Sequence, residues 1–151
     1  MMTLTRPETS YEGRLRINAR RVRAGWATFL AEFSWEDMLT LTTNPKIVRG
    51  MTEKRMRHDV ERFCYDLAYL SRREVGWAFA VEGGGGPSLH AHVLVMGATT
   101  KARQAAFAGW QARSGFTQRT PVDSSIRAAV YLCKSIGRNG EIVFSDRLRS
   151  R

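Results

Sequence analysis

The feature that most constrains the fold is a pair of alternating segments joined by a glycine-rich loop. Residues 76–82 place Trp77, Phe79 and Val81 on one side, and residues 89–96 alternate in the same way. A period of two is typical of β-strands. The loop between them, residues 83–88, includes four consecutive glycines and is too short for a crossover helix, so the two strands must pair antiparallel. The chain therefore needs an antiparallel sheet, which excludes a purely parallel architecture.

The rest of the chain alternates between helical and strand patterns. Apolar spacing predicts helices over 19–33, 52–73, 101–113 and 124–138, and alternation predicts strands over 38–43, 116–120 and 141–145. These elements indicate an α+β class with a central antiparallel sheet of about five strands flanked by helices. A chain of 151 residues suits one hydrophobic core, so we expect a single domain over 19–151 after a flexible basic segment, 1–18.

The longest predicted helix, which Thr52 caps, carries one apolar and one polar stripe. The apolar stripe is expected to face the core and comprises Met56, Val60, Phe63, Leu67 and Leu70. The polar stripe is interpreted as a solvated surface in preference to a binding surface, and comprises His58, Arg62, Tyr65, Tyr69 and Arg72.

Net charge indicates the class of partner. Lysine and arginine number 24 against 14 aspartate and glutamate residues, a formal charge of +10 at pH 7. Such a domain attracts polyanions, and nucleic acid is the leading expectation, although basic proteins also bind membrane surfaces and acidic proteins. Five arginines near the N-terminus either form a DNA-binding arm or keep the protein soluble: Arg14, Arg16, Arg20, Arg21 and Arg23.

Apolar and cysteine patterns favour a cytoplasmic setting. No apolar run approaches the roughly 20 residues needed to cross a bilayer, and the first 16 residues lack the apolar centre of a secretory signal. Cys64 and Cys133 lie far apart without a zinc-binding spacing, so two buried thiols are favoured over a disulfide. We expect a cytoplasmic protein of bacterial, phage or plasmid origin that binds no membrane.

The predicted hairpin gathers metal-binding residue types on one face. Period two turns His90 and His92 away from the apolar side, and antiparallel pairing brings Glu82 to the same face as His90. The small side chains of Ala78 and Ala80 flank this patch and are expected to leave space above it. Two imidazoles and one carboxylate leave coordination positions open on a divalent ion, as a Lewis acid at a phosphate requires. The alternative is a pair of structural histidines.

The last long helix presents a tyrosine among cations. Helical spacing places four polar side chains on one face, namely Arg127, Tyr131, Lys134 and Arg138. An adjoining apolar arc is expected to pack on the sheet and comprises Ile126, Ala129, Val130, Cys133 and Ile136. A phenol surrounded by cations suits a phosphodiester, although a free tyrosine is a weak nucleophile until its phenolate is favoured. The alternative is an ordinary amphipathic surface helix.

Taken in order along the chain, these residues resemble a known family. Glu82 followed by His90-Ala91-His92 resembles the paired-histidine motif and upstream acidic ligand of the HUH endonucleases, and Tyr131-Leu132-Cys133-Lys134 resembles their Y-x-x-K motif. The strand 38–43 looks like the family's first motif. The resemblance covers about residues 33–145 and is to the single-tyrosine initiators of rolling-circle replication.

The resemblance implies an RRM-like fold and a nicking and joining reaction on single-stranded DNA at an origin or hairpin. Glu82, His90 and His92 would bind Mg²⁺ or Mn²⁺. Tyr131 would attack a phosphodiester, leaving a 5′-phosphotyrosine and a free 3′-OH, and Lys134 would assist it. Contacts with DNA are expected from Thr40, Thr42, Arg127 and Arg138. The helicase domain of some viral initiators has no counterpart in the sequence. Either a separate helicase serves, with a polymerase as a further expected partner, or the protein is a phage, plasmid or transposon version, or the chain is a fragment.

Several alternatives stay open at this point. A single-tyrosine transposase would carry the same motifs, and a dimer that shares its active sites would favour it. A non-catalytic module could bind single-stranded nucleic acid by stacking bases on aromatic rings, although Trp77 and Phe79 are expected to face the core. A zinc hydrolase or an iron oxygenase could use the same three ligands. A phosphate-binding loop is excluded because the four glycines precede a strand and not a helix.

Overall fold

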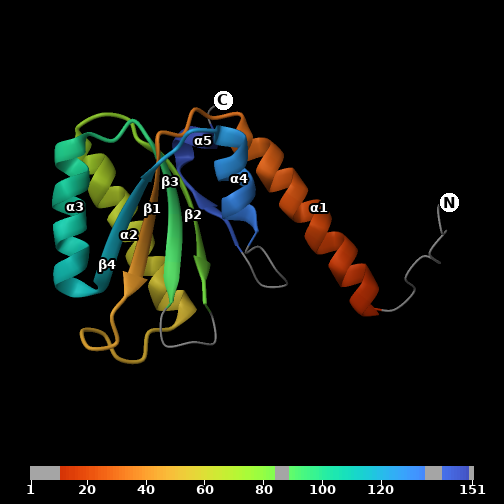
Figure 1. The fold of residues 1–151 in the computed structure, drawn as a ribbon, viewed down its shortest axis with the longest axis horizontal. Coiled ribbons are helices and arrows are strands. Elements are labelled where there is room, and N and C mark those ends of the chain that lie inside the picture. The colour runs from red at the N-terminus through yellow and green to blue at the C-terminus, as the bar shows by residue number, and fades with distance from the viewer. Residues whose placement is uncertain (1–10, 84–88, 135–140, 150–151) are drawn as a thin grey trace.

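The computed structural model describes residues 11–83, 89–134 and 141–149, with side chains described from residue 20 to residue 148 within these ranges. Helices and strands follow one another along the chain as Figure 1 shows. Their bounds are α1 Tyr11–Ala31, β1 Asp37–Thr43, α2 Glu53–Ser71, β2 Gly76–Glu82, β3 His90–Met96, α3 Thr100–Arg113, β4 Gly115–Pro121, α4 Ser125–Cys133, β5 Val143–Phe144 and α5 Asp146–Arg149.

The five strands form one sheet in the order β4-β1-β3-β2-β5, and every neighbouring pair is antiparallel. Helix α2 connects β1 to β2 across the intervening β3, and α3 connects β3 to β4 across the intervening β1. Two interleaved strand–helix–strand units of this kind make an RRM-like arrangement. The predicted α+β class and the antiparallel sheet are therefore confirmed.

Helices cover both faces of the sheet. In Figure 1, α2 and α3 lie on one face, whereas α4, α5 and the C-terminal end of α1 lie on the other. The first face buries large side chains such as Trp77 and Phe79 against α2 and α3, as the alternation predicted. The second face is built from smaller residues, and here Ala78 and Ala80 pack under Leu132 of α4 and its neighbours.

That second core corrects one expectation about the hairpin. The alanines were expected to leave open space, but Ala78 is 0% exposed and Ala80 is 3% exposed. Small side chains allow a helix to approach the strands closely, so their role is to seat α4 and α1 on the sheet. Open space begins only beyond the alanines, where the face becomes polar.

Helix α2 has the predicted start and most of the predicted apolar face. The Thr52 hydroxyl accepts a hydrogen bond from the backbone N–H of Arg55 at 3.2 Å, which is the N-cap arrangement. The stripe is buried from Met56 to Leu67, but Leu70 is 43% exposed and its prediction is wrong. The buried residues of α2 instead include Cys64 and Ser71, and the Ser71 hydroxyl accepts a hydrogen bond from the backbone N–H of Thr99, which caps α3. The polar stripe is exposed throughout, as expected.

Other elements depart from their predicted bounds. Helix α1 begins at Tyr11, well before residue 19, because its polar first half has helix-forming residues but no apolar periodicity to reveal it. On α4, Ile126 and Val130 are 66% and 55% exposed, although they were expected to pack on the sheet. The helix is rotated toward Leu132, which is buried with Ala129 and Cys133. The short helix α5 was not predicted.

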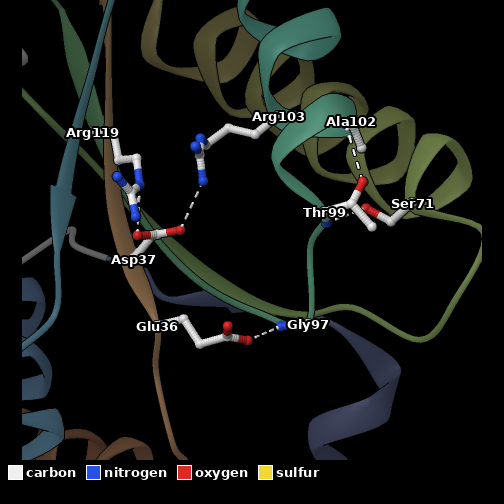
Figure 2. A network of polar contacts seen from close by, with 8 residues as sticks. All are labelled: Glu36, Asp37, Ser71, Gly97, Thr99, Ala102, Arg103 and Arg119. Carbon is white, nitrogen blue, oxygen red and sulfur yellow. Dashed lines mark hydrogen bonds and ion pairs between the residues drawn. The ribbon is translucent and has the colours of Figure 1, made fainter.

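Charged groups tie the start of β1 to its neighbours, as Figure 2 shows. The buried carboxylate of Asp37 accepts hydrogen bonds from Arg103 of α3 at 3.2 Å and from Arg119 of β4 at 2.8 Å. Close by, the Glu36 carboxylate accepts from the backbone N–H of Gly97, just after β3. These contacts hold the edge strand β4 in register with β1, and β1 carries part of the site described next.

Candidate functional site

Three possible metal ligands meet at one end of the central strands. Glu82 ends β2 and is paired directly with His90, the first residue of β3, so the predicted pairing is confirmed. His90 Nε2 lies 2.9 Å from Glu82 Oε2, and His92 Nε2 lies 3.5 Å from the same oxygen. One ligand atom from each of the three residues lies within 4.8 Å of the other two. This group could hold a metal ion.

Strand β1 supports the cluster from the other side. Thr40 is paired with His92 and Thr42 with His90 across the β1–β3 ladder. The Thr40 hydroxyl lies 3.2 Å from Nδ1 of His92. When Nδ1–H donates to that hydroxyl, the lone pair of Nε2 points toward Glu82 and is available to a cation. Thr40 therefore orients one ligand of the cluster.

The electrostatic setting keeps His92 in its metal-binding form. The residue is only 7% exposed. Burial lowers the pKa of His92, and the charges of His90 and Lys134 lower it further against the opposing pull of Glu82. A neutral imidazole is the form that ligates a cation. The donor set and the neutral form favoured for His92 therefore both fit a divalent ion.

Helix α4 brings Tyr131 against this cluster. The ring of Tyr131 meets the ring of His92 edge to face, with 5.1 Å between their centroids. The Nζ of Lys134 lies 3.8 Å from the centroid of the Tyr131 ring, a cation–π contact. Tyr131 is 42% exposed, so the residue is partly accessible although its ring contacts His92 and Lys134.

The side chains border a cleft of about 610 Å³ between the sheet and α4. Eight of the nine residues proposed for the site line it, namely Thr40, Thr42, Glu82, His90, His92, Arg127, Tyr131 and Lys134. The ninth, Arg138, lies outside the described residues. Arg127 pairs at 3.1 Å with Asp123, which lies just before the start of α4, and both side chains are mostly exposed.

Sequence reasoning missed the contribution of β4 to this face. Gln118 lines the cleft beside Thr40, with which it is paired, and Phe116 is paired with Thr42, which also lines the cleft. Alternation along 116–120 would have placed Phe116, Gln118 and Thr120 on one face. Alternation alone could not identify the neighbouring strand, because no local sequence pattern indicates that β4 pairs with β1.

Comparisons with protein-family models, with curated proteins and with solved structures gave no match. In the part of the chain that the structure describes, no helix is both long enough and apolar enough to span a membrane. Cys64 and Cys133 are free and buried, as expected.

Proposed function

We propose that the protein is a metal-dependent endonuclease that nicks and rejoins single-stranded DNA through a covalent tyrosine intermediate. The observation that carries this proposal is the contact between Tyr131 and His92. It places a residue that can act as a nucleophile next to a group that could hold a metal ion, in one cleft. The resemblance to single-tyrosine HUH endonucleases supports it. The residues that meet in the cleft are the same residues that match the paired-histidine motif and the Y-x-x-K motif of that family, in the same order along the chain. Initiation of rolling-circle replication is the role that we assign.

The cluster suits a divalent cation, for which we propose Mg²⁺ or Mn²⁺. Glu82, His90 and His92 would hold it, and Thr40 would keep His92 in the binding tautomer. A cation held by three protein ligands has open positions and, when bound, polarises a phosphate oxygen and withdraws charge from the phosphorus. Mg²⁺ and Mn²⁺ accept oxygen ligands readily, so the phosphate would complete such a site.

The side chains of α4 supply the remaining chemistry. The Tyr131 oxygen attacks the phosphorus, the bond from phosphorus to the 3′ oxygen breaks, and the phenol proton is lost. The products are a 5′-phosphotyrosine and a 3′-OH that takes up a proton. Lys134, which already contacts the Tyr131 ring, offsets negative charge as it accumulates on the phosphate. The reverse attack by a 3′-OH rejoins the strand without an external energy source.

A replication initiator is favoured over a transposase by the location of α4. The tyrosine and the three possible ligands belong to one chain and meet within it. A transposase that shares its sites between subunits would need the tyrosine to meet the cluster of a partner. The intramolecular contact therefore supports a site that one chain completes.

The test is a denaturing gel of the full chain with end-labelled single-stranded oligonucleotides in Mn²⁺. Hairpin and origin candidates from the neighbouring genome are the substrates. The wild type should retain the label covalently, and both Tyr131→Phe and EDTA should abolish the adduct. Tyr69→Phe is the matched control, because Tyr69 is 83% exposed on α2, on the opposite face of the sheet, and should behave like the wild type.

Two other results would redirect the assignment. Metal-dependent cleavage that survives in Tyr131→Phe means that water is the nucleophile, as in a metal hydrolase. Binding of single-stranded DNA with no cleavage of any oligonucleotide means a binding module without chemistry.

A further inference from the structure

The edge strand β4 carries an exposed aromatic ring close to the cluster. Phe116 is 59% exposed, although its neighbour along the chain, Gly115, is buried. Helix α4 packs over β2 and β3, so it covers the part of the sheet away from β4. The Phe116 side chain therefore lies beside Thr42, which lines the cleft, on the face that holds the histidines.

Sheet register fixes the position of this ring relative to the metal ligands. Thr42 is paired with His90 on one side and with Phe116 on the other, so all three side chains project from the same row and face. Neighbouring strands lie about 4.8 Å apart, which puts the Phe116 backbone about 10 Å from that of His90. A DNA strand whose phosphate is held at the cluster would therefore reach the Phe116 ring within a nucleotide or two of that phosphate.

The backbone under Phe116 is held by close contacts. A Cβ added at Gly115 would lie 2.1 Å from the carbonyl oxygen of Thr42. At this position β4 therefore approaches β1 more closely than any residue type other than glycine would allow. The Trp110 indole N–H donates to the same carbonyl at 3.2 Å from the opposite face of the sheet. Asn44 N–H donates to the Ser114 carbonyl at 2.8 Å. The ring is thus carried on fixed backbone, as a preorganised contact requires.

The surrounding charges complement a nucleotide chain. Arg127 and Lys134 line the cleft and suit phosphates, whereas Phe116 offers an exposed, flat apolar surface beside Thr42 of the cleft wall. Cations that track the backbone combined with an aromatic ring that stacks a base form the usual platform for single-stranded nucleic acid. Tyr65 and Tyr69 are also exposed, but they lie on α2, on the opposite face of the sheet, and neither lines the cleft.

We infer that Phe116 stacks a base of the single-stranded DNA whose phosphodiester lies at Glu82, His90 and His92. The inference rests on the proposed function for the placement of the phosphate. It adds a base-binding position that fixes how the strand lies across the sheet, from the cluster over Thr42 to the edge strand.

The test measures binding of fluorescent single-stranded oligonucleotides by anisotropy in Mn²⁺, on a Tyr131→Phe background. Phe116→Ala should weaken binding about tenfold, which corresponds to about 1.4 kcal/mol. Phe116→Trp should restore it, since the larger ring also stacks. Tyr69→Ala is the control for loss of an exposed ring and should leave binding unchanged. Circular dichroism checks that each variant is folded.

An abasic scan separates stacking from a general loss of surface. Removing one base at a time should reveal a single position that costs the parent about tenfold and costs Phe116→Ala nothing further. If Phe116→Ala binds within twofold of its parent, or no position shows this coupling, the stacking role is overturned while the nicking proposal stands. If the parent binds no single-stranded DNA, both are overturned.

Discussion

Replacement of Glu82 by glutamine separates metal binding from folding. The carboxylate is the one anionic member of the cluster, and its side chain is 15% exposed with His90 2.9 Å away. Glutamine has almost the same shape and can still hydrogen-bond a histidine, so we expect the metal-free protein to lose less than about 1 kcal/mol of stability. The cation, however, loses its only charged ligand.

The expected magnitude follows from linkage. A cation at one hundred times its dissociation constant stabilises the folded state by about 2.7 kcal/mol. For a chain of this size each kcal/mol raises the melting temperature by about 2–4 °C, so wild type should gain about 5–11 °C in Mn²⁺. If Glu82→Gln weakens binding about 100-fold, the same Mn²⁺ concentration gives about 0.4 kcal/mol, or roughly 1 °C.

The assay is thermal unfolding by circular dichroism with and without Mn²⁺, with the concentration set from calorimetric titration of the wild type. Glu74→Gln is the matched control, because the Glu74 side chain is 83% exposed and pairs only with surface-exposed Arg147 among the ion pairs described. It should keep the full metal-induced gain. An equal gain in Glu82→Gln, or no gain in the wild type, would refute the assignment of the cluster as a metal site.

Three further predictions test the framework around the site. Gly115→Ala should destabilise the protein by about 1–3 kcal/mol in urea unfolding, since its Cβ would strike the β1 backbone. Gly25→Ala, where a Cβ meets nothing within 4 Å on helix α1, should instead stabilise it by about 0.5–1 kcal/mol, and the reverse order would contradict the register of β4. Burial raises the pKa of the Cys133 thiol from 9.0 to about 11, so its contribution to stability is fully present below pH 9 and is lost as the pH rises through about 11. Wild type should therefore lose more stability than Cys133→Ala between pH 8 and pH 11 in urea titrations, and parallel losses would show that the thiol is not involved. Charge reversal on α1 should lower both the affinity for single-stranded DNA and its salt slope, and unchanged slopes would assign these residues to solubility: Arg20, Arg21 and Arg23.

Local sequence patterns correctly predicted the structural features that depend only on residues close together in the sequence. Alternation and a short loop were enough to pair Glu82 with His90, because a hairpin leaves little choice of register. The cap at Thr52 and most of the buried face of α2 followed from side-chain chemistry and helical spacing. These features need no knowledge of the rest of the fold.

The features that could not be predicted from the sequence depend on contacts between segments that are far apart along the chain. The place of β1 between β3 and β4 is set by two helical crossovers, and it alone brings Thr40 beside His92 and Phe116 beside Thr42. The rotation of α4 was also misjudged, since Leu132 and Ile126 are equally apolar and only packing against α1 decides which is buried. Periodicity identifies an apolar face but does not locate its partner.

The dependence of α4 on α1 links the N-terminal helix to the chemistry. Helix α4 packs against α1, and Leu30 of α1 shares a buried cluster with Ala129 and Leu132 of α4. Ser125, at the start of α4, accepts a hydrogen bond from the backbone N–H of Trp35 just after α1. Because these contacts fix the rotation of α4, they also fix where Tyr131 meets His92. The C-terminal end of α1 therefore belongs to the framework of the site, although the remainder of that helix extends away from the sheet (Figure 1).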